Sequence, residues 1–251
     1  MSALIVAATA LAGNPLLESY KTAHQTIPFN ELKNEHYFPA FQEAMKQHSD
    51  EIDAIVANIQ TPTFDNTIVA LEKSGSLLTK VGSPFYNMLG SETNDELQAI
   101  AEKISPLVTE HSNSIKLNEK LFARVKAVYS QKDKLKLTVE QQMLLKNTYE
   151  GFANNGANLS EADKVSYREL SKDLNLLTLQ YGQNVLKETN NYSLLVTEKA
   201  LLSGLSADFT EMLASNAKKV GKTGWLLNLK ATCYVPFMKY ADNRDLRREP
   251  A

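Results

Sequence analysis

The chain has 251 residues, of which 43% are hydrophobic and 22% are charged. This length is sufficient to bury a large core in one large domain or two small ones, and the composition excludes a disordered or fibrous protein. The 27 basic and 29 acidic residues leave a net charge of -2. Because the chain has no broad positive field, we expect no nucleic-acid partner.

The only cysteine of the sequence is Cys233. One thiol cannot form a disulfide framework within the chain or a cysteine-based zinc site. We therefore expect Cys233 to be a small buried apolar residue.

Residues 2–12 form an apolar run that ends in Ala10-Leu11-Ala12, the small-x-small pattern of a signal-peptidase site. The run is shorter than the roughly 20 apolar residues of a membrane-spanning helix, so no membrane span is expected. We interpret residues 1–13 as a signal-peptide-like remnant and expect a periplasmic or secreted protein. The run lacks the usual preceding positive charge, so an ordinary N-terminal helix in a cytoplasmic protein is the alternative.

The first half of the chain predicts several helices after an extended lead-in over residues 13–33. Helical spacing of apolar residues over residues 38–59 predicts a helix entered near Pro39. Asn66 is expected to cap the next helix, which Gly75 interrupts. Further start signals are Asn94 and Asn118 and the capping-box pair of Thr138 and Gln141.

The longest periodic stretch begins at Ser160 and predicts a helix of roughly thirty residues. Its apolar residues share one side: Val165, Leu170, Leu174, Leu177, Tyr181 and Val185. Residues 192–197 and 225–229 are short apolar runs that predict two strands, separated by a helix near residues 206–220. The predicted fold class is all-α, a multi-helix array with a very small two-stranded β element near the C-terminal end.

The four histidines are the candidate metal ligands, and their spacing argues against a zinc site. A zinc-peptidase helix needs two histidines four residues apart with a glutamate between them, and no pair has this spacing. His36 and His48 lie too far apart along one helix to share an ion. We expect His48 to be packed in the core, and His24 and His111 to lie at the surface.

Other catalytic patterns are also missing from the sequence. It contains no Gly-rich phosphate loop, no Gly-x-Ser-x-Gly motif and no Cys-His arrangement. We therefore assign no catalytic, cofactor-binding or metal-binding residue to this chain and expect it to hold no zinc by itself.

Six segments, taken together and in order, resemble the N-terminal part of the M3 family of zinc oligopeptidases, and within it the bacterial peptidyl-dipeptidases, also called dipeptidyl carboxypeptidases. The segments are residues 26–55, 61–75, 92–106, 117–129, 156–190 and 235–247. The resemblance extends from about Asn14 to Arg247. It implies an almost all-helical clamshell with a deep channel that admits short peptides.

The same resemblance implies a zinc ion that is held by a His-Glu-x-x-His helix and a later glutamate, several hundred residues beyond this chain. The matching portion would supply much of one wall of the channel. Pro250 lies where the family's helix would continue, so we expect a truncated fragment. In this interpretation residues 14–251 are a helical N-terminal domain that ends before the catalytic zinc domain.

Two functional hypotheses follow. In the first, the chain is the channel-wall portion of a zinc metallopeptidase that removes dipeptides from short peptides or cleaves them otherwise. It is inactive alone and its partner is the missing C-terminal catalytic half. The alternative is a non-catalytic helical interaction module derived from a peptidase half. A severed half should expose apolar helix faces, whereas a self-sufficient module should not.

Overall fold

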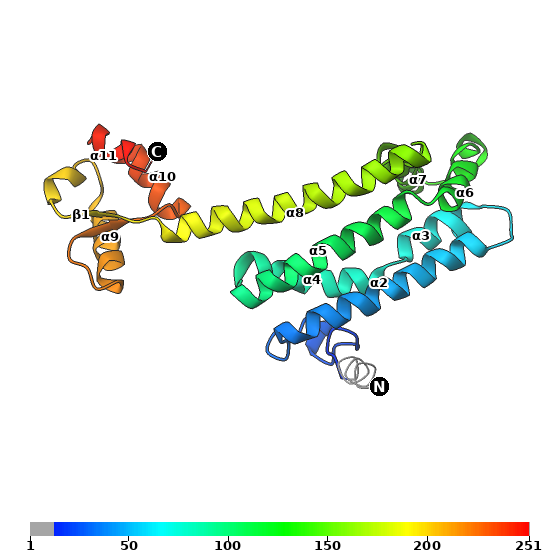
Figure 1. The fold of residues 1–251 in the computed structure, drawn as a ribbon, viewed down its shortest axis with the longest axis horizontal. Coiled ribbons are helices and arrows are strands. Elements are labelled where there is room, and N and C mark those ends of the chain that lie inside the picture. The colour runs from blue at the N-terminus through cyan, green and yellow to red at the C-terminus, as the bar shows by residue number, and fades with distance from the viewer. Residues whose placement is uncertain (1–12, 251) are drawn as a thin grey trace. The chain divides into compact units, whose positions relative to one another are not determined.

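A computed structural model describes residues 13–250, and the signal-like run over residues 2–12 lies outside them. The described residues are mainly helical with one two-stranded sheet, which confirms the predicted fold class. The chain divides into two compact units, with the boundary between Leu177 and Thr178 (Figure 1). Among residues 13–250, no helix combines the length and the apolar character needed to cross a membrane.

Unit 1 is built almost entirely from helices. After the lead-in, which contains only turns and η1 (Ala23–Gln25), these are α2 (Asn34–Ala57), η2 (Phe64–Val69), α3 (Ala70–Lys73), α4 (Ser76–Ser91), α5 (Asp95–Lys116), α6 (Glu119–Tyr129), η3 (Lys132–Lys134), α7 (Val139–Asn154) and α8 (Glu161–Asn191). Helix α8 has 31 residues, which confirms the predicted length of roughly thirty. It continues across the boundary into unit 2.

The predicted caps of three helices are confirmed. The side chains of Asn94 and Asn118 each accept a hydrogen bond from the backbone N–H three residues on, at 2.9 and 3.0 Å, and open α5 and α6. Thr138 Oγ1 accepts from the N–H of Gln141 at 3.3 Å, and the Gln141 side chain accepts in return from the N–H of Thr138 at 3.0 Å. Each bond pairs a backbone donor that the first helical turn leaves open.

Two predicted helix starts are wrong. Helix α2 begins at Asn34, so Pro39 lies inside it. Pro39 is the sixth residue of α2, so its missing N–H removes one backbone hydrogen bond, the one to the carbonyl of Glu35. The cap of η2 is Thr63 and not Asn66, because the Thr63 hydroxyl accepts from the Asn66 N–H. Gly75 does interrupt the helix, as predicted: it has φ of 70° and separates α3 from α4.

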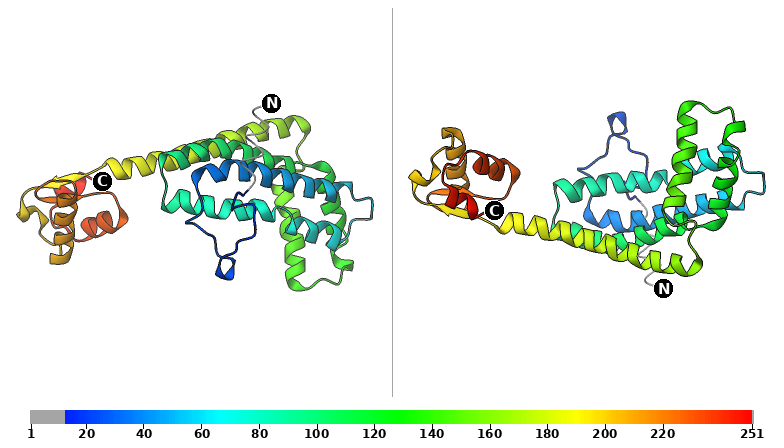
Figure 2. Two further views of the ribbon diagram at one scale, coloured as in Figure 1. Left: turned by 90° about the horizontal axis from the view of Figure 1, so that it is seen from below. Right: turned by 90° about the horizontal axis from the view of Figure 1, so that it is seen from above.

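Helices α2, α4 and α5 lie side by side in unit 1 (Figure 1). Phe85 of α4 packs edge-on against Tyr37 and Phe41 of α2, with ring centroids 5.1 and 5.2 Å apart. Helices α6 and α7, drawn in green in Figure 2, pack against each other near the C-terminal end of α2. The buried cluster there consists of Ile52, Ile55, Phe64, Ile68, Leu121, Phe122, Val125, Val128, Leu145, Phe152 and Ala157.

A buried arginine joins three of these elements. Arg124 of α6 is only 9% exposed. Its Nη1 donates to the carbonyl oxygen of Asn58 at the end of α2 at 2.7 Å, and its Nη2 donates to the side chains of Asn66 and Thr67 at 3.2 and 3.4 Å. A cation at the carbonyl end of a helix is favourable, and hydrogen bonds to a charged donor are stronger than neutral ones. Arg124 therefore fixes the otherwise irregular link between α2 and η2.

Unit 2 contains both predicted strands. β1 (Leu194–Val196) pairs antiparallel with β2 (Trp225–Leu227), with Leu195 opposite Leu226. Between them lie η4 (Lys199–Leu202) and the predicted helix, α9 (Ala207–Lys219); α10 (Ala231–Tyr240) and α11 (Arg244–Arg248) follow. The core of this unit consists of Val196, Leu202, Leu213, Leu227, Cys233, Phe237 and Ala241. Cys233 is buried, as predicted.

Candidate functional site

The structure brings two of the four histidines together. His24 lies exposed in η1, and His36 accepts a hydrogen bond from the N–H of Lys33 at the start of α2. His48 of α2 and His111 of α5 contact each other although 63 positions separate them. The prediction that His111 lies at the surface is wrong, since it is half-buried. Its position three residues after Val108 continues the apolar spacing of α5 and could have indicated this.

The two rings belong to a chain of hydrogen bonds across three elements. His111 Nε2 lies 2.9 Å from His48 Nδ1, and the other nitrogen of His48 lies 3.2 Å from Ser74 Oγ. The Ser74 hydroxyl donates to the carbonyl of Leu71 at 2.7 Å, so its oxygen is left to accept from His48 Nε2. His48 Nδ1 is then the acceptor for the N–H of His111. One neutral tautomer of each ring satisfies the whole chain.

Burial acts on the charge of both rings. It lowers the pKa of His48, against which the nearby Glu51 carboxylate acts in the opposite direction. Burial also lowers the pKa of His111, and a charge on His48 lowers it further. Both imidazoles are therefore held in the neutral form that the hydrogen bonds require.

This pair of histidines does not form a metal site. The facing nitrogens share a hydrogen bond, and the outer nitrogen of each ring faces a serine oxygen, since Ser49 Oγ lies 3.5 Å from His111 Nδ1. Across residues 13–250, no group of three or more His, Cys, Asp or Glu side chains could hold a metal ion. The donors that the described residues offer therefore do not fit a zinc ion, and the geometry favours a structural role for the histidine pair.

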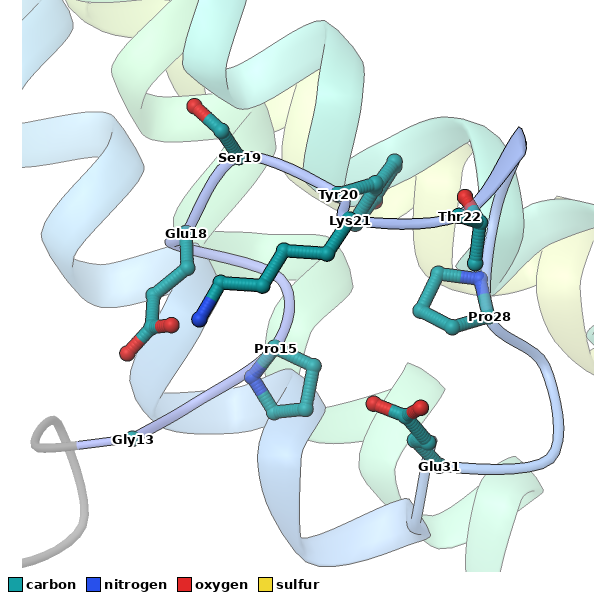
Figure 3. Close-up of a pocket in the computed structure, with 9 residues that line it drawn as sticks. All are labelled: Gly13, Pro15, Glu18, Ser19, Tyr20, Lys21, Thr22, Pro28 and Glu31. Atoms are coloured by element: carbon teal, nitrogen blue, oxygen red, sulfur yellow. The ribbon is translucent and has the colours of Figure 1, made fainter. Parts of the chain in front are cut away.

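The lead-in folds around a pocket of about 280 Å³, with Glu18, Lys21 and Glu31 among its lining residues (Figure 3). Behind it, the ammonium of Lys80 lies 4.4 Å from the centre of the Tyr20 ring and donates to the carbonyl of Glu18. Burial raises the pKa of Tyr20. These contacts attach the lead-in to α4.

Helix α8 exposes most of its apolar side chains. Leu170 and Leu177 are 68% and 62% exposed in unit 1, and Tyr181 and Val185 are exposed in unit 2. The helix instead meets the rest of unit 1 through charged residues. Arg168 Nη1 lies 2.9 Å from Glu110 of α5, whose other oxygen lies 3.1 Å from Lys172. An apolar helix side that faces water is typical of an interaction surface.

A second charged contact attaches the start of α8 to α6. The Lys164 side chain is only 5% exposed, and its ammonium lies 2.7 Å from Glu119 and 2.8 Å from Glu161. Hydrogen bonds to these two carboxylates raise the pKa of Lys164. Ion pairs of Lys164, Arg168 and Lys172 thus attach α8 to α6 and α5.

Sequence comparison identifies what the chain is related to. The dipeptidyl carboxypeptidase of Escherichia coli K12 is 38% identical over 237 residues, which are 94% of this chain and 35% of that protein. Over 94% of its length the chain is similar to this peptidase and to oligopeptidase A, and it covers about a third of each of these proteins. Oligopeptidase A of Salmonella typhimurium is 27% identical over 94% of the chain, and the organellar oligopeptidase A of Arabidopsis thaliana is 23% identical over 98%. No family model matches the chain.

The comparisons confirm the family resemblance and also define its extent. The chain spans about a third of the length of the relatives it matches. A match over 94% of the chain includes the whole of α8 and most of both units.

Proposed function

We propose that this chain is the channel-wall portion of a zinc metallopeptidase that removes dipeptides from short peptides or cleaves them otherwise, and that it is inactive alone. One observation carries the proposal. The chain is 38% identical to a dipeptidyl carboxypeptidase over 94% of its own length but over only 35% of that protein. The reaction then depends on residues in the remaining part of such a protein, and this chain limits which peptides reach them.

The exposed side of α8 supports the same proposal. Leu170 and Leu177, both in unit 1, are 68% and 62% exposed. Burying a large apolar side chain contributes about 1.5–3 kcal/mol, so these residues would stabilise an interface with the catalytic part. Such a surface favours a severed half over the alternative, a self-sufficient interaction module.

Zinc would be bound in the catalytic part and would polarise the peptide carbonyl and activate the attacking water. The residues of this chain that the structure describes do not fit that ion, as the pairing of His48 with His111 illustrates. Their proposed task is to position short peptides and to limit which peptides reach the catalytic residues. No step of the bond cleavage is assigned to them.

A chimera tests the proposal directly. The 237 matched residues of the Escherichia coli dipeptidyl carboxypeptidase are replaced by the matching residues of this chain, and zinc content and dipeptide release are measured. We expect the chimera to bind one zinc and to release dipeptides. A chimera that folds and binds zinc but does not cleave short peptides would contradict the proposed role.

Two matched double variants of the chimera examine the surface of α8. Leu170→Asp with Leu177→Asp should reduce activity at least tenfold, because it places charges in the proposed interface. Ile59→Asp with Val139→Asp, at exposed apolar positions outside α8, adds the same two negative charges; it is the control and should leave activity within about twofold. Equal losses in both would argue that added negative charge, rather than the α8 surface, is responsible.

We propose a periplasmic or secreted location, on the basis of the apolar run over residues 2–12. A cytoplasmic location is the alternative. Residues 1–13 fused to a reporter enzyme that is active only outside the cytoplasm should give activity. A reporter that stays inactive, with full-length fusion detected inside the cells, would favour the cytoplasm.

A further inference from the structure

Unit 2 contains a pocket of about 470 Å³ that the peptidase resemblance does not account for. Its lining comes from the end of α8, the last turn of α9, and the segment from β2 to the first turn of α10. The volume lies within the range of about 300–1,000 Å³ that is typical of pockets for small ligands.

Three lysines line this pocket: Lys219, Lys222 and Lys230. Within residues 13–250 none of the three forms an ion pair, in contrast to Lys164 and Lys172 of α8. No Asp or Glu belongs to the described residues that line the pocket. The pocket therefore concentrates three positive charges in a chain whose net charge is -2.

The other polar groups of the lining are suited to the same kind of ligand. Asn190, Asn191 and Asn216 add amide donors. Cys233 adds no negative charge, because burial raises the pKa of its thiol, and its sulfur accepts from the N–H of Asn228 at 3.4 Å. At the start of α10 the Asn228 side chain accepts the N–H of Lys230 at 3.0 Å, and the positive end of the helix dipole adds to the potential there.

One acidic residue lies close to the edge of the pocket. Tyr192 lines it, and burial and then the charge of Glu249 raise the pKa of that phenol. Glu249 is exposed and is not part of the lining. The three lysines of the lining are exposed as well, so solvent screens both signs of charge, and the lysines outnumber this carboxylate.

We propose that this pocket binds a carboxylate group of a peptide, with Lys219, Lys222 and Lys230 as the cationic side of the site. Lysine binds a carboxylate as a point charge with up to three donors, and the four asparagines of the lining can bind the peptide groups next to it. The carboxylate can come from the C-terminus of a peptide or from an acidic side chain. The choice of a peptide rests on the proposed function.

Calorimetric titration of the full 251-residue chain tests the site with four probes. These are an N-acetylated tetra-alanine with a free C-terminus, its C-terminal amide, the amide with one internal glutamate, and inorganic phosphate. We expect the free-carboxylate peptide to bind at least tenfold more tightly than the amide. The glutamate peptide distinguishes the two sources of the carboxylate, and tight binding of either supports the site. Tighter binding of phosphate than of both carboxylate peptides would overturn the proposal.

Two triple variants of equal charge identify the binding place. Lys219→Gln, Lys222→Gln and Lys230→Gln together should weaken the binding at least tenfold. The control replaces Lys187, Lys218 and Lys239 with glutamine. These three lysines do not line the pocket, so the control should change the affinity less than twofold. Equal weakening in both variants would overturn the site, because the general charge of the chain would then be responsible.

These titrations need no catalytic activity, so they can fail while the chimera succeeds. In that case the pocket assignment is wrong and the peptidase assignment stands. If the chimera is inactive but the free-carboxylate peptide still binds at the three lysines, the peptidase assignment is wrong and the pocket assignment stands.

Discussion

Helices α6 and α8 are both amphipathic, yet only α6 buries its apolar side within this chain. Leu121 of α6 is 0% exposed, whereas Leu177 of α8 is 62% exposed. Helix α8 meets α5 through Arg168 and Lys172, which lie close to Glu110. Apolar spacing thus shows that a helix has an apolar side, but it does not show whether the same chain covers that side.

The largest effect is expected where α6 is packed. Leu121→Ala removes a fully buried side chain at the centre of the α6 core, and the cavity should lower the free energy of unfolding by about 3 kcal/mol. Urea denaturation, followed by circular dichroism, measures this change. A loss below about 1 kcal/mol would mean that this core is looser than its complete burial indicates.

The junction between α3 and α4 should be the next most sensitive place. Gly75 has φ of 70°, and a Cβ there would lie 2.8 Å from Cε1 of His48. Gly75→Ala combines backbone strain with this collision and should cost about 2 kcal/mol. Gly90→Ala is the control, because no atom lies within 4 Å of its added Cβ, and we expect it to be neutral or slightly stabilising in urea denaturation. Equal effects of the two variants would contradict the packing of His48 against Gly75.

The helix caps and the histidine pair show how much of the structure the sequence could predict. The caps at Asn94, Asn118 and Thr138 were predictable because each bond spans three residues. The contact between His48 and His111 spans 63 positions and depends on how α2 and α5 pack. No local pattern carries that information: the helical spacing placed His48 on an apolar stripe, but His111 was expected at the surface.

The pocket in unit 2 was not predicted for a related reason. Lys219, Lys222 and Lys230 come from the end of one helix, a loop and the start of another helix. In the sequence they resemble ordinary surface lysines. Only the antiparallel pairing of β1 with β2 and the packing around it bring them to one pocket.

A smaller, pH-dependent effect is expected from the two histidines. Burial lowers the pKa of both in the folded chain, while in the unfolded chain an imidazole titrates near pH 6.5. As the pH falls through about 6.5, the unfolded chain therefore binds protons first. The stability from the pair is complete above that pH and is lost as the pH falls toward the lowered folded values. Urea midpoints measured between about pH 7.5 and about pH 5.5 should decrease.

The charged groups around the pair set the size of this loss. Glu51 of α2 favours protonation of His48, but its carboxylate also accepts the N–H of Gly75 at 2.7 Å. Glu110, next to His111, lies within 3.1 Å of Arg168 and Lys172. The double variant His48→Gln, His111→Gln should have a shallower pH dependence than the parent chain. An unchanged slope would assign the effect to other groups.

The smallest effect is expected on the exposed side of α8. Leu177→Ala should change the free energy of unfolding of the isolated chain by less than about 0.5 kcal/mol, because little of its surface leaves water on folding. The loss in free energy of unfolding should therefore be severalfold larger for Leu121→Ala in α6 than for Leu177→Ala in α8. A loss at Leu177 as large as that at Leu121 would show that the chain itself covers this side of α8.

The central claim is that this chain supplies a wall for peptides and that the cleavage chemistry lies elsewhere. Metal analysis of the purified chain, combined with an assay for dipeptide release, tests it most directly. The account predicts less than stoichiometric zinc and no release of dipeptides. One tightly held zinc per chain, together with dipeptide release that a chelator abolishes, would contradict it.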